Sequence, residues 1–382
     1  MNGRAWRAWW PALAAGALLS GAAVARQAAP QQPNAPEQVT KAPPAQPLDD
    51  GSLRAAYFDL LGRPPFAEER AHWLGHARRE LCDALIDSSE YWKQWLEEQL
   101  YYFFLIDNFR PESERVAAIP AELCAHRLNV RDAIHRIALC PSFDQRNPGA
   151  DTFVTVVMEQ LDGIKVQKNA RELAVGKAIY DGAPGTFLGK SGTSQADIVR
   201  IAVEDKLFAE TFLAREYKRL VRREPEKKTF NDWVRRFQHD PSLYTAFVRE
   251  WILSGEWDQR LAHPLDQPNR LFVRAMFVDL LGRLPEDDDA RRLRTALDGL
   301  SDPGPLRSVL ARLLIDSKAM KLPERGAIGD PVPWVTDLFR RLLGRDPSEQ
   351  ELTTFVEALR DPACRPATVL YAIVTHPEYQ SY

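Results

Sequence analysis

Residues 57–65 read Tyr-Phe-Asp-Leu-Leu-Gly-Arg-Pro-Pro, and the chain returns to this pattern three more times. Four prolines can be aligned without a gap. An Arg stands two residues before each proline, a Leu five before and an aromatic residue eight before. The corner residues of the four units are Gly62, Arg63 and Pro65; Arg223 and Pro225; Gly282, Arg283 and Pro285; and Gly344, Arg345 and Pro347. Chance does not readily place these residue types in one register four times, so we interpret the pattern as an internal repeat.

The spacing within each unit predicts two helices joined at a corner. The aromatic residue and the aliphatic residues before the corner lie three and four positions apart, which places them on one helical face. Gly adopts the left-handed conformation that ends a helix, and Pro fits the first turn of the next helix. Acidic residues follow each proline and favour the positive end of the new helix dipole.

A third helix is expected to close each unit, ending near residues 88–91, 254–257, 317–320 and 376–379. The predicted fold class is therefore all-α, with repeated three-helix units, Gly-Arg-x-Pro corners between helices and one irregular, loop-rich insert. Unit 2 carries Arg222 where the other units have Gly. We expect that corner to be strained by about 1 kcal/mol or to take a different shape.

The repeat positions predict the domain organisation. A first helical domain covers 50–210 and holds unit 1 and the irregular segment, unit 2 covers 211–264, and units 3 and 4 cover 265–382. Within the insert, residues 182–192 are rich in Gly and predict a loop with room for a short hairpin near 183–190. Ser194 is a capping residue for a helix that we expect to run to about Leu213.

The N-terminus predicts export. Residues 1–25 contain Arg4 and Arg7, then an apolar stretch, then Ala-Val-Ala, which is the order of a secretory signal peptide. The apolar stretch of about 14 residues is shorter than the roughly 20 that a membrane-spanning helix needs, and an uncleaved anchor is the alternative. Residues 26–49 are rich in Pro, Gln and Ala and predict a flexible tether. The expected location is periplasmic or extracellular.

The net charge and the cysteine spacing argue against several classes of ligand. The net charge is −3, which leaves no basic field for nucleic acid or for an anionic membrane surface, so the only membrane contact expected is an uncleaved signal segment. The four cysteines are Cys82, Cys124, Cys140 and Cys364, and export permits disulfides. We prefer the pair Cys124–Cys140, with buried free thiols as the alternative. The spacings required for haem attachment or for a zinc site are absent.

Several attractive active-site patterns fail on spacing. Residues 185–191 are one residue short of a phosphate-binding loop. His72 and His76 lack the Glu that a zinc protease requires after its first His. The acidic run 286–289 lacks the spaced ligands and Gly of a calcium loop. Glu159 and Asp162 lie three apart, as pairs on helical surfaces often do. We therefore assign no catalytic, cofactor-binding or metal-binding residue.

Two resemblances accompany these motifs. The Leu-Leu-Gly-Arg-x-Pro turn with a later Ser-x-Glu-Tyr ending resembles the helical repeat related to phycobilisome linker polypeptides. Residues 50 to 165 resemble an exported bacterial family of unknown function that is often fused to cytochrome-c-like domains. The matching stretches are 59–69, 85–95, 151–154 and 159–163. Neither resemblance implies a reaction, and no haem-attachment motif occurs in this sequence.

The leading functional hypothesis is an exported, non-catalytic scaffold or protein-interaction module with an envelope or extracellular protein partner and no cofactor. It follows from a helical repeat, whose outer surfaces can bind proteins, beside the failure of each active-site pattern. The alternative is an enzyme or electron-transfer accessory with its site in residues 101–192, the aromatic and Gly-rich part of the chain.

Overall fold

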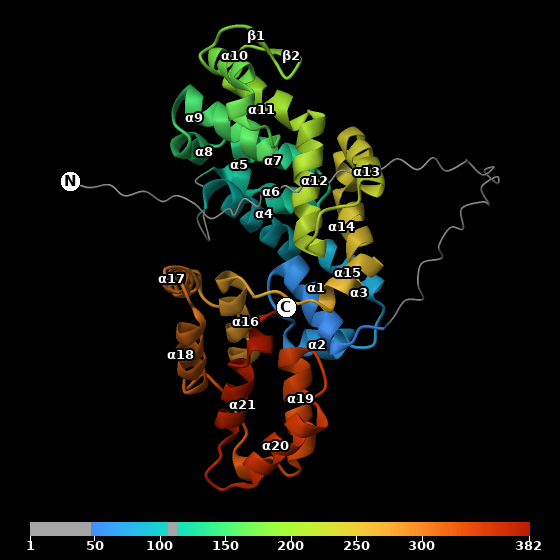
Figure 1. Ribbon diagram of the computed structural model, residues 1–382, viewed down its shortest axis with the longest axis vertical. Helices are drawn as coiled ribbons and strands as arrows, with labels where there is room; N and C mark the ends of the chain where they lie inside the picture. The colour runs from blue at the N-terminus through green and yellow to red at the C-terminus, as the bar shows by residue number, and fades with distance from the viewer. Residues whose placement is uncertain (1–46, 106–112) are drawn as a thin grey trace, which may run out of the picture. The chain divides into compact units, whose positions relative to one another are not determined.

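The computed structural model describes residues 47–105 and 113–382, and helices dominate both ranges (Figure 1). The all-α prediction is confirmed. In the described part of the chain the one sheet is an antiparallel hairpin of β1 (Gly185–Phe187) and β2 (Lys190–Gly192). The predicted signal peptide, 1–25, and nearly all of the predicted tether, 26–49, lie outside the described residues. None of the helices described here combines the length and the apolar character needed to cross a membrane.

Each of the four aligned sequences folds as a helix, a corner, a second helix and a third helix. In unit 1 these are α1 (Asp50–Leu61), α2 (Ala67–Trp73) and α3 (Arg78–Ile86); in unit 2, α12 (Lys206–Val221), α13 (Lys227–His239) and α14 (Tyr244–Ile252); in unit 3, α16 (Asn269–Leu281), α17 (Asp287–Asp298) and α18 (Gly304–Ile315); in unit 4, α19 (Pro331–Leu343), α20 (Glu349–Arg360) and α21 (Pro366–Val374). Short 3-10 turns, η3 (Pro241–Leu243) and η4 (Arg325–Ala327), lie before α14 and α19.

All four corners end their first helix in the left-handed conformation. Gly62, Gly282 and Gly344 have φ values of 65°, 64° and 73°, and Arg222 has φ 61° and ψ 22°. Of the two outcomes expected at Arg222, the structure shows the strained residue and not a different shape. Its guanidinium donates a hydrogen bond to the Tyr382 backbone oxygen and lies 4.1 Å from the centre of the Tyr382 ring. These contacts offset the cost of a side chain in this conformation.

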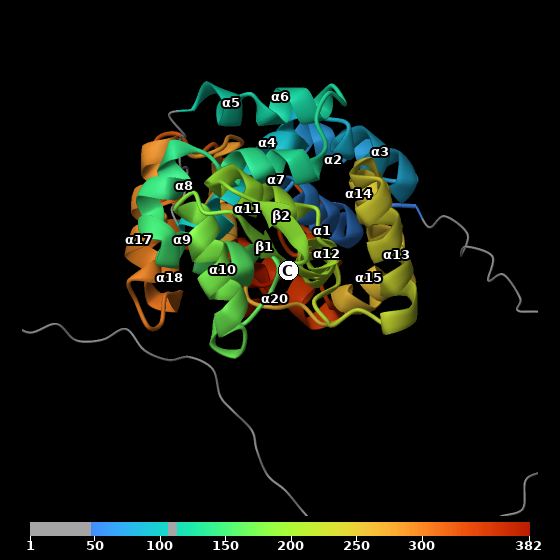
Figure 2. The same ribbon diagram turned by 90° about the horizontal axis from the view of Figure 1, so that it is seen from above.

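The insert between units 1 and 2 is also helical. It contains α4 (Ser89–Phe104), α5 (Glu114–Ala117), α6 (Ile119–Cys124), α7 (Val130–Ala138), α8 (Pro141–Arg146), α9 (Gly149–Val156), the π-helical turn η1 (Val157–Leu161), the 3-10 turn η2 (Val166–Lys168), α10 (Ala170–Tyr180) and α11 (Gln195–Val203). The hairpin lies against α10 and α11 (Figure 2).

The helix expected from Ser194 to about Leu213 is in fact two helices. Ser194 accepts a hydrogen bond from the Asp197 backbone N–H and caps α11 as predicted. The chain then turns at 204–205, and Asp205 caps α12 by accepting from the Leu207 N–H. The apolar spacing continues across the break, which is why the sequence pattern did not show it.

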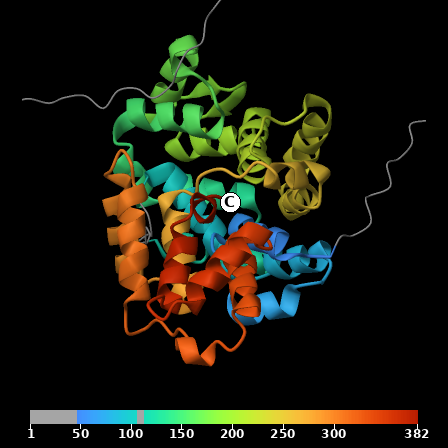
Figure 3. The ribbon, with the colours of Figure 1, turned by 60° about the horizontal axis from the view of Figure 1, so that its bottom comes forward.

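Two hydrophobic clusters organise the described residues, 47–105 and 113–382, which belong to one compact unit. The first contains buried residues from 48 to 257 and joins units 1 and 2 with the insert. The second contains buried residues from 272 to 379 and joins units 3 and 4, seen in orange and red in Figure 3. Phe58 on α1 contacts Leu271 and Ala275 on α16 in a third, small cluster that includes Tyr382. Helix α1 therefore packs within the first cluster and also against α16, which carries part of the second.

Two glycines allow the backbones of units 1 and 4 to approach each other closely. A Cβ added to Gly344, at the end of α19, would lie 2.7 Å from the Gly51 Cα, and one added to Gly51 would lie 2.8 Å from the Gly344 oxygen. Gly344 is thus required twice, for its positive φ and for the space it leaves. At the equivalent Gly282 an added Cβ would meet nothing within 4 Å.

We expect Gly344→Ala and Gly282→Ala to differ although they are equivalent in sequence. Gly282→Ala should cost only the left-handed strain, about 1 kcal/mol. Gly344→Ala should cost roughly 2–4 kcal/mol, because α1 must also move away from α19. Urea unfolding followed by circular dichroism measures both. Equal losses would contradict a tight contact between α1 and α19.

Candidate functional site

The corner arginine of unit 1 uses all of its hydrogen-bond donors. Arg63 donates from Nε and Nη2 to Glu90, from Nη1 and Nη2 to Glu69, and from Nη1 to the Pro64 carbonyl, over distances of 2.6 to 3.1 Å. Its guanidinium carbon lies 5.4 Å from the centre of the Tyr57 ring. A guanidinium has five N–H groups, and all five are bonded here. Because Arg63 is 2% exposed, it is a structural contact and not a free ligand-binding group.

Unit 4 reproduces this arrangement with the same types of charged residue at the equivalent positions. Arg345 donates to Glu351, Glu378 and the Asp346 carbonyl through the same nitrogens, and it lies 5.4 Å from the Phe339 ring centre. We call this arrangement the corner clamp: an arginine, a carboxylate six residues later and a carboxylate after the third helix. Hydrogen bonds from Arg345 hold the pKa of Glu351 at about 2, below its ordinary value.

The clamp is incomplete in the other two units. In unit 2, Arg223 lies 2.7 Å from Glu256, but Thr229 replaces the carboxylate six residues later. In unit 3, Ala319 replaces the last carboxylate. Among the described residues, Arg283 keeps only the carbonyl contact, to Leu284 at 3.0 Å, and the ring contact, to Phe277 at 5.3 Å. The predicted corner residues therefore form similar turns but differ in their side-chain partners.

A second shared position was missed by the sequence analysis. Six residues before each corner proline the chain has Asp59, Arg219, Asp279 and Arg341 in turn. Arg219 donates to the Asp59 backbone carbonyl at 2.5 Å, and Arg341 to that of Asp279 at 2.7 Å. The alternation of Asp and Arg is visible in the sequence, but only these hydrogen bonds show which units pair: 1 with 2, and 3 with 4.

The two aspartate side chains are buried and meet the end of the partner unit. Asp59 accepts hydrogen bonds from Trp257 Nε1 at 2.7 Å and from Arg260, both on α15 (Gly255–Leu261). Asp279 accepts from the Tyr379 hydroxyl at 3.0 Å, within the 3-10 turn η5 (Pro377–Gln380), and from both terminal nitrogens of Arg54. Burial lowers the pKa of Arg54, but Asp279 and Tyr379 together raise it above its ordinary value, so Arg54 keeps its charge.

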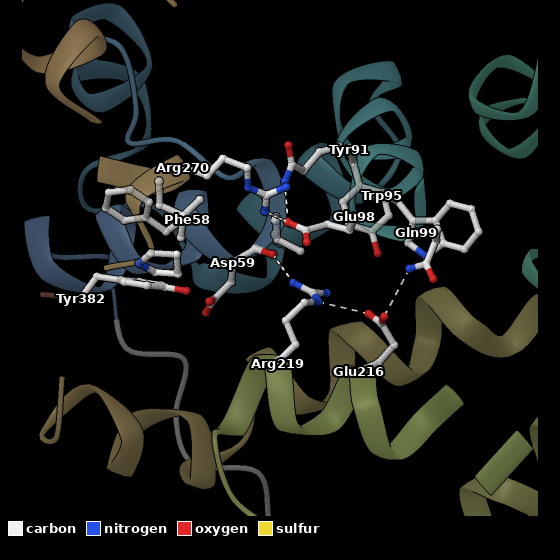
Figure 4. Close-up of a pocket in the computed structure, with 14 residues that line it drawn as sticks. Phe58, Asp59, Tyr91, Trp95, Glu98, Gln99, Glu216, Arg219, Arg270 and Tyr382 are labelled. Carbon is white, nitrogen blue, oxygen red and sulfur yellow. Dashed lines mark hydrogen bonds and ion pairs between the residues drawn. The ribbon is translucent and has the colours of Figure 1, made fainter. Parts of the chain in front are cut away.

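A cavity of about 170 Å³ lies where α1, α4, α12 and the start of α16 meet (Figure 4). Glu98 forms an ion pair with Arg270, and Glu216 lies 3.1 Å from Arg219 and accepts from the Tyr244 hydroxyl at 2.8 Å. Burial raises the pKa of Glu98, but Arg270 and Arg219 lower it below its ordinary value. These charged groups in the cavity wall are thus paired with one another. Such a cavity is better suited to hold ordered water than a reacting substrate.

The cysteine prediction is wrong in the structure. Cys124 and Cys140 are free thiols, as are Cys82 and Cys364. The Cys124 sulfur contacts the Asp87 carbonyl at 3.5 Å, whereas Cys140 is buried in the first cluster. The structure therefore agrees with the alternative of free thiols, of which Cys82 and Cys140 are buried.

The remaining candidate residues lie in the insert. Glu159 accepts a hydrogen bond from the Val166 N–H at 3.5 Å. Asp162 follows the π-helical turn η1, is 3% exposed, and has no hydrogen-bond partner for either carboxylate oxygen among the described residues. Burial raises the pKa of Asp162 well above its ordinary value. No group of three or more His, Cys, Asp or Glu able to hold a metal occurs in 47–105 or 113–382.

Comparison of the chain with models of known protein families, with curated proteins and with solved structures finds no match.

We expect the corner clamp of unit 4 to make the free energy of unfolding depend on pH in the acidic range. The pKa of Glu351 is lowered in the folded state, so its contribution is complete above the unfolded value of 4.5 and is lost as the pH falls toward 2. Glu351→Gln should therefore remove part of the acid-induced loss of stability below pH 5. Denaturant midpoints measured from pH 7 to pH 3 test this. The control is Glu349→Gln, an exposed carboxylate on the same helix; equal pH profiles of the two variants would contradict the clamp.

Removal of the buried carboxylate between units 3 and 4 should be far more costly. Asp279→Asn leaves Arg54 as a buried, uncompensated charge, and we expect a loss of about 3–5 kcal/mol. The matched control is Asp337→Asn, which breaks an ion pair whose carboxylate is 56% exposed and should cost under about 1 kcal/mol. Calorimetric melting temperatures compare the two; similar small shifts would show that Asp279 does not hold the unit pair together.

Proposed function

We propose that this chain is an exported helical-repeat protein that acts as a non-catalytic scaffold or protein-interaction module. The observation that supports the proposal is that the repeated polar residues form hydrogen bonds inside the protein. Arg63 and Arg345 are bonded within their corners, and Asp59 and Asp279 are bonded to the ends of neighbouring units. These four repeated polar residues therefore hold helices together, which leaves the outer surface for recognition.

Exposed apolar side chains on α18 support a protein-binding surface. Val309 is 52% exposed and Leu313 62%. They lie eight and four residues before Ser317, which follows the third helix of unit 3. Counted in the same way, the other units have Glu80 and Ala84, Ala246 and Glu250, and Thr368 and Ala372. Large apolar residues in water are unfavourable and often mark an interaction site, and here they distinguish unit 3 from the rest.

The expected setting of this function is outside the cytoplasm. The signal-peptide pattern of 1–25 and the Pro-rich stretch that follows support export and attachment through a flexible tether. We propose an envelope or extracellular protein as the partner.

A second candidate is an enzyme or electron-transfer accessory with its site in 101–192. One observation favours it. Asp162 is a buried carboxylate without a partner among the described residues, and it follows a π-helical turn. Both features cost stability and are often found at functional sites.

Affinity purification of the full chain from an envelope fraction tests the proposal. We expect a protein partner to co-purify with the wild-type chain and to be lost with Val309→Asp and Leu313→Asp together. The same two charges placed at Thr368 and Ala372 of unit 4 form the matched control and should leave the partner bound. Recovery of the chain alone, as a monomer, would count against a scaffold. A metal or an absorbing cofactor in the purified protein would instead favour the second candidate.

A further inference from the structure

The last carboxylate of the corner clamp always comes from the first turn of a following helix. Glu90, Glu256 and Glu378 are each the second residue of a helix or 3-10 turn, in α4, α15 and η5. The capping residue before them is Ser88, Ser254 or His376, whose side chain accepts a backbone N–H two or three residues later. Three units thus present the same feature to the corner arginine, a capped helical turn with Glu at its second position.

Unit 3 lacks this helical turn. After Ser317 the chain makes a non-helical turn through 318–319, and Ala319 takes the place of the Glu. The guanidinium of Arg283 is still oriented by the Leu284 carbonyl and the Phe277 ring, as in units 1 and 4. Asp289, the residue six positions later, makes no ion pair with it. Arg283 and Ala319 are exposed, so the receptor half of a clamp faces solvent.

We propose that Arg283 is a docking point for a partner protein, which supplies the missing element in trans: the first turn of a helix with a capping side chain and Glu at its second position. This inference rests on the proposed interaction function and names the chemistry of the partner. A preset guanidinium favours a carboxylate that it can bind with two parallel hydrogen bonds. Leu284, 40% exposed beside it, offers an apolar contact.

The surrounding charges favour this occupant over a phosphate group. Residues 286–289 are all acidic and lie directly after the corner, and of these Asp288 forms an ion pair with Arg291. A group with two negative charges would be repelled by them more strongly than a single carboxylate. The chain itself places one Glu against an equivalent arginine in three other corners, so the proposed geometry is one that this corner type accommodates.

The test uses a labelled peptide with the sequence of residues 253–262, which contains the clamp element of unit 2. We expect the full chain to bind it in fluorescence anisotropy, and the peptide with Glu256→Gln to bind about tenfold more weakly, as loss of one charge-assisted contact predicts. Arg283→Gln in the protein should weaken binding by the same factor. Ala319→Glu should abolish binding, because the chain then supplies its own carboxylate.

The matched control is Arg292→Gln, which removes the same charge from an exposed position on α17 of the same unit. It should leave binding unchanged. Equal affinity for the Glu and Gln peptides, or equal losses in Arg283→Gln and Arg292→Gln, would overturn the inference. Failure of the proposed scaffold function would give a different result. Peptide binding at Arg283 without any envelope partner would contradict the scaffold function but not this site. An envelope partner that still binds the Arg283→Gln variant would contradict only the site.

Discussion

The arrangement of the helices depends on two buried aspartates, Asp59 and Asp279. A carboxylate removed from water costs several kcal/mol unless it is paired and hydrogen-bonded. Each of these carboxylates is satisfied by a group from the end of another unit, Trp257 for Asp59 and Tyr379 for Asp279, together with a buried arginine. A shifted register would leave both the acid and the arginine uncompensated. The four units are therefore organised as two pairs, and Arg54 connects the first pair to the second.

The corners have a different role, which is local. A left-handed residue stops each first helix, and in units 1 and 4 the following arginine binds the second helix and the element after the third. Where the clamp is complete, in units 1 and 4, its arginine is fully bonded. The corner shape persists in unit 3 without the carboxylates, which indicates that backbone conformation and apolar burial are enough to form the turn. The clamp residues are thus free to differ between units.

These differences are where function can be sought. Repeated residues that are buried or paired cannot also recognise a partner, so recognition falls to positions at which one unit departs from the others. Unit 3 departs most clearly, with an unclamped Arg283 and exposed Val309 and Leu313. Cavity-lining charges such as Glu98 and Glu216 are by contrast paired with arginines. The molecule thus has a structural interior and one unit with an unusual surface.

The sequence alone determined the all-α class, the four corners and the approximate ends of the helices. Those features depend on interactions within about one helical turn, such as the glycine conformation, the proline position and the capping side chains. Even the alternation of Asp59, Arg219, Asp279 and Arg341 is present in the sequence, although its meaning is not. Local patterns failed at 204–205, where Asp205 starts a new helix within a continuous apolar pattern.

Only the tertiary structure decided which distant groups meet. Trp257 and Arg260 reach Asp59 across about 200 residues of sequence, and Cys124 and Cys140 form no disulfide although they are close in sequence. Local sequence patterns do not predict such contacts. A buried charge must be paired or hydrogen-bonded, and its partner comes from whichever helix packs beside it. The same holds for Arg283: the sequence shows that a corner arginine exists, but only the structure shows that no carboxylate of the described residues forms an ion pair with it.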